Sequence, residues 1–201
     1  MSHEVFEIIR NMDLSDIEVQ MALQCAPFIS GLKVSNLFIV CDEHLDYLIS
    51  LLNEMNITWK ILFRGKKKTT LLMYKANMLR RYFSDARVKA LMMKAGYKRE
   101  HVDDEDIEML MEIFCNRYQR YMKTKRQFPH EMGLFLGYPV EDVEGYLNNN
   151  GENSLYTGYW KVYENLDEKF RLFKSFEAAK ENIIRFLAQG VSIKNIAEAV
   201  Q

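Results

Sequence analysis

The sequence predicts an α+β fold, in which helices cover a small, mostly antiparallel sheet of about four strands. Of the 201 residues, 48% are hydrophobic, 27% are charged and only 3 are proline, so the chain can bury a core and is not disordered over long stretches. In most segments apolar residues recur every three or four positions, as in amphipathic helices. A few short segments instead alternate or are continuously apolar, which indicates strands. No repeat, low-complexity tract or linker interrupts this pattern, so we expect a single domain over residues 1–201.

The first half of the chain is expected to supply most of the sheet. Val5, Ile9 and Met12 share one face of a short helix, and the apolar run 35–41 is typical of a buried strand. Two further alternating segments flank a short loop at Gly65, which predicts a hairpin. In order, we expect a short N-terminal helix, a helix capped by Ser15 or Asp16 and ended by Gly31, a strand at 35–41, a helix capped by Asp42, and a hairpin of residues 57–64 and 68–75.

The second half is expected to be mainly helical. A segment beginning at Asp103 is acidic at its start and basic at its end, which suits the dipole of a long helix. Pro129 and Pro139 each open a short helix, and Gly137 separates the two. In order, we expect short helices at 77–83 and 86–95, the long helix from Asp103, two short helices within 128–151, a last strand at 154–163, a helix at 166–188 and a terminal helix capped by Ser192.

Charge is strongly segregated along the chain, although the net charge is only -1. Residues 60–99 contain thirteen Lys and Arg against one Asp, whereas residues 1–59 and 100–113 are acidic. The basic block predicts a patch that could bind nucleic acid or an acidic partner, with these candidate residues: Lys66, Lys67, Lys68, Arg80 and Arg81. The sequence pI of about 6.4 and the lack of a recognised nucleic-acid motif argue against this interpretation. The acidic segments could instead neutralise the basic block within the fold or across a homodimer.

Three sequence blocks carry a resemblance to a known family. These are QCAPFISGLKVSNLF (24–38), FPHEMGLFLGYPVEDVEGYL (128–147) and GYWKVY (158–163). In combination they resemble a bacterial family of uncharacterised proteins, the domain of unknown function numbered 3793. The resemblance implies no established activity; it implies a redox or iron-homeostasis context. Many members carry extra cysteines around the final strand and in the last helix, and this chain has none there, which weakens any role that depends on those thiols.

The two C-terminal blocks predict a ligand site. His130 and Glu131 lie in the first turn of a predicted helix, where Glu131 occupies a capping position and the field keeps His130 neutral. Tyr159, Lys161 and Tyr163 would share one face of the last strand and could stack a planar anionic ligand such as a flavin, haem or nucleotide. Two structural interpretations stay open. The block 128–147 can be a helix start whose His130 packs on the sheet, and the block 158–163 can be an amphipathic strand.

A second functional interpretation is a hydrolase or transferase that uses Cys25 and His130. A nucleophilic Cys needs a lowered pKa, but Cys25 lies late in its helix within the apolar stripe, where it can equally be a small buried hydrophobe. Only Glu131 or Asn36 could serve as the third member of a catalytic triad with Cys25 and His130.

No cofactor or metal is identified from the sequence. The four histidines show no ligand spacing, and there is no CxxC motif. Three unclustered cysteines, an N-terminus unlike a signal peptide and the lack of a long apolar run predict a cytoplasmic protein with no membrane contact.

Overall fold

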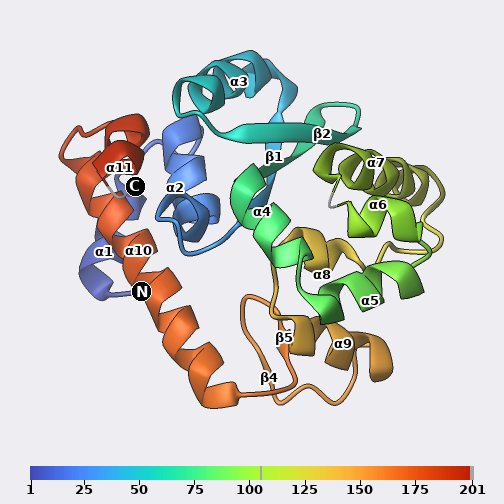
Figure 1. The fold of residues 1–201 in the computed structure, drawn as a ribbon. Helices are drawn as coiled ribbons and strands as arrows, with labels where there is room; N and C mark the ends of the chain where they lie inside the picture. Colours follow the sequence, from blue (N-terminus) through green and yellow to red (C-terminus); the bar gives the residue numbers. More distant parts are fainter. Residues whose placement is uncertain (105, 200–201) are drawn as a thin grey trace.

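The computed structural model, shown in Figure 1, describes residues 1–104 and 106–199. Its sheet has three antiparallel strands in the order β1-β3-β2, which are β1 (Ser35–Cys41), β2 (Thr58–Arg64) and β3 (Lys68–Tyr74). Tyr74 at the end of β3 pairs with Ser35 on one side and Thr58 on the other. The central strand is therefore hydrogen-bonded along both edges, and the α+β prediction is confirmed.

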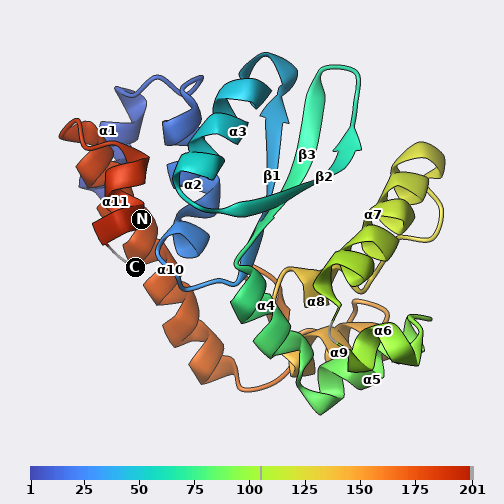
Figure 2. The same ribbon diagram turned by 45° about the horizontal axis from the view of Figure 1, so that its top comes forward.

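Helices cover both faces of this sheet (Figure 2). On one face lie α1 (His3–Arg10), α2 (Ile17–Ile29), α3 (Leu45–Glu54), α10 (Leu166–Ala188) and α11 (Ile193–Ala199). On the other side, a second group of helices shares one core with the sheet: α4 (Ala76–Phe83), α5 (Ala86–Lys94), α6 (Arg99–Asp103), α7 (Ile107–Thr124), α8 (Met132–Phe135) and α9 (Val140–Asn148).

The central strand β3 joins two hydrophobic cores. Leu71 and Met73 belong to the first core, with side chains of α1, α2, α3, α10 and α11. Leu72 and Tyr74 belong to the second core, with side chains of α4 to α9. This division follows from the period of two in a strand, which sends successive side chains to opposite faces. A smaller third cluster consists of Trp160, Val162, Phe173 and Phe176.

Several local expectations are wrong in detail. The segment 154–163 is a hairpin separate from the main sheet, with β4 (Tyr156–Thr157) and β5 (Lys161–Val162) joined by a turn. The acidic segment after residue 98 forms the separate short helix α6 before α7 begins. Asp42 does not cap α3; it lies in a short 3₁₀ turn (Asp42–His44) and accepts a hydrogen bond from the Thr69 hydroxyl at 2.7 Å. Within the part of the chain that is described, no helix is long and apolar enough to cross a membrane.

Candidate ligand-binding site

A cavity of about 260 Å³ opens where α8 and α9 meet the β4–β5 hairpin. We call it the aromatic cavity, because most of its wall is made of rings and aliphatic groups. Its lining residues are Phe128, His130, Met132, Gly133, Leu136, Tyr138, Asp142, Val143, Tyr146, Tyr159, Trp160 and Lys161.

The wall between α9 and the hairpin depends on one buried carboxylate. Asp142 is 2% exposed and accepts hydrogen bonds from Trp160 Nε1 at 2.7 Å and from the Tyr163 backbone N–H at 2.8 Å. The Glu164 N–H adds a longer bond at 3.3 Å. A buried carboxylate needs such donors to replace water. Trp160 is thereby fixed with its ring stacked on Tyr138, 4.9 Å between centroids.

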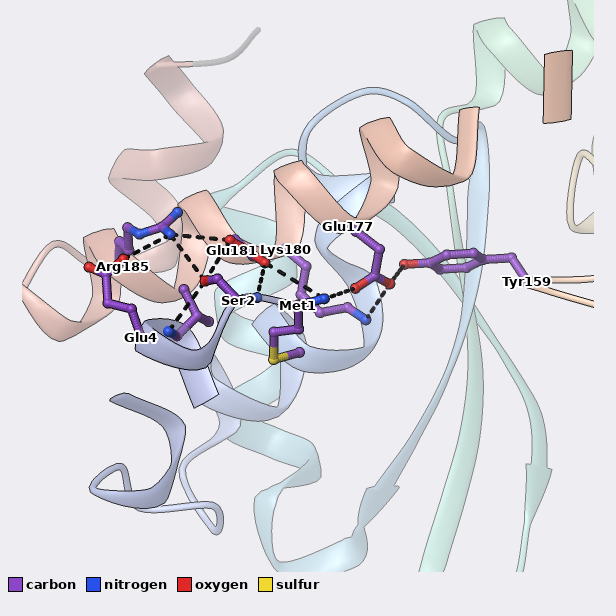
Figure 3. A network of polar contacts seen from close by, with 9 residues as sticks. Met1, Ser2, Glu4, Tyr159, Glu177, Lys180, Glu181 and Arg185 are labelled. Atoms are coloured by element: carbon purple, nitrogen blue, oxygen red, sulfur yellow. Dashed lines mark hydrogen bonds and ion pairs between the residues drawn. The ribbon is translucent and has the colours of Figure 1, made fainter. Parts of the chain in front are cut away.

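Another lining residue, Tyr159, is anchored to α10, as Figure 3 shows. The Tyr159 hydroxyl donates to Glu177 at 2.7 Å, and Lys180 donates to the same carboxylate at 3.3 Å. Burial and the Glu177 hydrogen bond raise the pKa of Tyr159, so the phenol stays a neutral donor. Burial opposes ionisation of Glu177, but these two donors outweigh it and hold its pKa below the usual value.

Three of the five predicted ligand residues line the aromatic cavity. His130 is exposed and lies 5.3 Å from the Phe128 ring and 5.6 Å from the Tyr146 ring, between centroids. It packs on these rings and not on the sheet. Lys161 lies at the rim, where its Nζ donates to the Gly151 carbonyl at 2.5 Å. Tyr159 completes the group from the turn of the hairpin.

Glu131 and Tyr163 point elsewhere. Glu131 is 7% exposed and faces α7, where its carboxylate accepts from Arg117 at 3.0 Å and from the Tyr97 hydroxyl at 3.3 Å. It lies at the N-cap position of α8, as expected, but its side chain makes no capping hydrogen bond. Tyr163 follows β5 and packs on Gly145 of α9; its covered hydroxyl has no hydrogen-bond partner among the described residues. The expected continuous strand face is wrong, because residues 158–160 form the turn.

The predicted basic residues are all exposed but fall into two groups. Lys66, Lys67 and Lys68 lie at the tip of the β2–β3 hairpin, whereas Arg80 and Arg81 lie on α4. The seven-residue strand β3 separates these groups by roughly 20 Å of backbone at about 3.3 Å per residue. Across residues 1–104 and 106–199, none of the five makes an ion pair within 4.0 Å.

The geometry argues against catalysis by Cys25 and His130. Cys25 is 0% exposed in the first core, and burial raises the pKa of its thiol to about 12. It accepts a hydrogen bond from Asn36 Nδ2 at 3.3 Å, and no hydrogen bond joins it to His130 in the described part of the chain. Asn36 also accepts from Lys33 Nζ at 2.9 Å. In the same described residues no group of three or more His, Cys, Asp or Glu side chains is arranged to hold a metal ion.

Sequence reasoning missed most of the cavity wall. The second resemblance block, residues 128–147, contains Phe128, Tyr138, Asp142 and Tyr146. The available signal was the density of aromatic residues across that block and GYWKVY. Spacing alone could not show that these rings converge, because the contacts join different elements.

The three blocks that carry the resemblance meet in space. The Ser35 hydroxyl donates to the Phe135 carbonyl at 2.5 Å, which joins the first block to the second. The Tyr138–Trp160 stack joins the second to the third. Residues 21–197 match a family model described as Protein of unknown function (DUF3793). No curated protein and no solved structure matches the chain.

Proposed function

We propose that this chain, which belongs to the DUF3793 family of proteins of unknown function, binds a small molecule that has a planar ring and negative charge. The ring occupies the aromatic cavity between α8, α9 and the β4–β5 hairpin. The observation that carries the proposal is a wall of aromatic rings with His130 and the cationic Lys161 among its few polar groups.

The aromatic wall favours a flat ligand. Tyr138 and Trp160 already stack on each other with 29° between their planes, and Phe128 and Tyr146 contribute further rings. Each offset or edge-on ring contact contributes about 0.5–1.5 kcal/mol beyond simple burial. A volume of about 260 Å³ lies just below the usual range of about 300–1,000 Å³ for ligand sites, so it suits one ring system.

The polar groups favour a negative charge on the ligand. The oxygens of Asp142 are already occupied by N–H donors, and the Tyr159 hydroxyl donates to Glu177. Lys161 uses one of its three donors on Gly151, which leaves two for a ligand. The charge available at the rim is therefore basic.

The proposal is tested by native mass spectrometry and absorption spectroscopy on gently purified protein. We expect a bound ring compound, or binding of added adenosine or riboflavin detected by quenching of tryptophan fluorescence. His130→Ala and Lys161→Ala should weaken binding of the co-purified compound at least tenfold, whereas Lys94→Ala, an exposed lysine on α5, should not. A visible absorption band would support a redox context. An empty protein that binds none of these compounds would overturn the proposal.

A second candidate function rests on the hairpin tip. Lys66, Lys67 and Lys68 are exposed together there, and such a group favours contact with nucleic acid or an acidic partner. Retention on a phosphate polymer that disappears at moderate salt, and in the Lys66→Ala, Lys67→Ala, Lys68→Ala triple variant, would support it. Unchanged retention in that variant would overturn it.

A further inference from the structure

We infer that the ligand carries a phosphate group, held in a second, polar hollow beside the aromatic cavity. The ligand class is then a phosphorylated ring compound of the kind represented by a mononucleotide. This inference rests on the proposed function and adds the place and chemical nature of the anionic group.

The second hollow shares a wall with the aromatic cavity. Its volume is about 310 Å³, and it is lined by Arg117, Arg120, Gln127, Phe128, Pro129 and Glu131. Phe128 lines both spaces. Its ring meets His130 edge-on on the cavity side and Tyr121 of α7 edge-on at 5.0 Å. Phe128 is 38% exposed, and it is the residue that the two linings share.

One ion pair builds the wall of the polar hollow and leaves its charge balanced. Arg117 donates to the Ala95 carbonyl at 2.6 Å, the Gly96 carbonyl at 3.2 Å and Glu131 at 3.0 Å. Its guanidinium also lies 4.5 Å from the Tyr97 ring centroid. Three of its five N–H donors are used in this way, and its charge is paired with Glu131, so we assign Arg117 to positioning the wall and Arg120 to binding the ligand.

Arg120 supplies the uncompensated positive charge. It lies one helical turn further along α7, is exposed, and forms no ion pair within the described residues. The segment that follows contains Lys123, Lys125 and Arg126 and no acidic residue up to residue 130, so the local potential attracts anions. A guanidinium can hold a phosphate through two parallel hydrogen bonds.

The two hollows complement each other chemically. The aromatic cavity offers ring contacts but few charges, whereas the polar hollow offers Arg120 but, apart from Phe128, no aromatic ring. A ring compound without a phosphate leaves Arg120 unused, and inorganic phosphate leaves the aromatic wall unused. A phosphorylated ring compound uses both.

The test compares matched ligand pairs on the full chain, adenosine with AMP and riboflavin with FMN, by isothermal titration calorimetry. We expect the phosphorylated member of at least one pair to bind at least tenfold more tightly. Arg120→Ala should remove this preference and leave the affinity for the unphosphorylated member unchanged, and Arg120→Lys should retain part of it. Lys94→Ala is the matched surface control, and circular dichroism confirms that each variant folds.

The outcomes separate this inference from the proposed function. If, in both pairs, the two members bind equally well, the phosphate site is overturned and the ring site stands. If Arg120→Ala keeps the preference, the placement at Arg120 is overturned. If the ring compounds do not bind with or without phosphate, and none co-purifies, the proposed function itself is overturned. If inorganic phosphate binds as tightly as AMP, the site binds anions without using the ring, and the inference of a phosphorylated ring compound is overturned.

Discussion

Asp142 shows how a single residue sets the shape of the candidate site. Its carboxylate is buried and accepts hydrogen bonds from N–H groups of Trp160, Tyr163 and Glu164, and none of these three donors is a cation. Such a carboxylate has a structural task, because it fixes the direction in which the Trp160 ring faces the cavity. Asp142 is therefore a positioning residue.

Replacing Asp142 by Ala should decrease the free energy of unfolding by about 1–3 kcal/mol, because buried N–H donors lose their acceptor. The same change should alter the fluorescence of Trp160 in the folded state. Asp142→Asn, which keeps one acceptor oxygen and the side-chain volume, should cost less. Urea denaturation measures both variants, and equal stability of Asp142→Ala and the wild type would contradict this assignment.

Cys25 is the residue whose chemistry the structure limits most clearly. Burial raises the pKa of its thiol to about 12, so at pH 7 only about one thiol in 10⁵ is ionised. We therefore expect iodoacetamide to modify the half-buried Cys41 in the native protein and to leave Cys25 unmodified until the chain unfolds. Mass spectrometry of digested protein locates the labels. Rapid labelling of native Cys25 at pH 7 would restore the hydrolase interpretation.

The raised thiol pKa also has a consequence for stability. The unfolded chain loses the Cys25 proton near its ordinary value of 9.0, whereas the folded chain keeps it to about 12. Between these values the folded state binds more protons than the unfolded state. The free energy by which Cys25 stabilises the fold is therefore undiminished below pH 9 and decreases as the pH rises from 9 to about 12. The stability difference between wild type and Cys25→Ala should accordingly shrink above pH 9.

At the scale of elements, the contact between α9 and the hairpin depends on the absence of a side chain. Gly145 lies within α9, and a Cβ there would collide with the Cβ and Cγ of Tyr163. Tyr163 follows β5, so this contact sets how closely the hairpin approaches the helix. The aromatic cavity lies between these same two elements.

Gly145→Ala should decrease the free energy of unfolding by about 1–2 kcal/mol, because the collision outweighs the roughly 1 kcal/mol by which Ala favours a helix. It should also displace Tyr163 and weaken ligand binding. Asn148→Ala, at an exposed position of the same helix, should change stability by less than about 0.5 kcal/mol. Denaturation curves compare the two, and a stabilised Gly145→Ala variant would show that the hairpin shifts without cost.

Elements were predictable where the sequence carries a local signal. The predicted strands 57–64 and 68–75 correspond to β2 and β3 within one residue, since alternation and a Gly loop are local features. The direction of Glu131 was not predictable, because its partner Arg117 comes from α7. The same holds for Asp42, which bonds to Thr69 across the sheet. The hairpin turn at residues 158–160 was hidden because the whole segment alternates like one strand.

At the scale of the whole molecule, two elements connect the three apolar clusters. β3 contributes Leu71 to the first core and Leu72 to the second. The long helix α10 contributes Phe173 and Phe176 to the third cluster and Ile183 to the first core. A substitution that destabilises one cluster is therefore expected to destabilise the others as well, because they share these elements.

This connection predicts that the chain unfolds in a single transition. In the Trp59→Phe variant, Trp160 fluorescence reports the third cluster while circular dichroism reports all helices, and both should give one urea midpoint. Leu71→Ala and Leu72→Ala, made in this background, should each cost about 2–5 kcal/mol and lower both midpoints together, although the two side chains face different cores. Separate midpoints would mean that the hairpin and its cavity unfold as an independent unit. So would a Leu71→Ala variant in which the midpoint reported by Trp160 fluorescence is unchanged. The expected single domain would then be wrong, and the ligand site could be studied apart from the sheet.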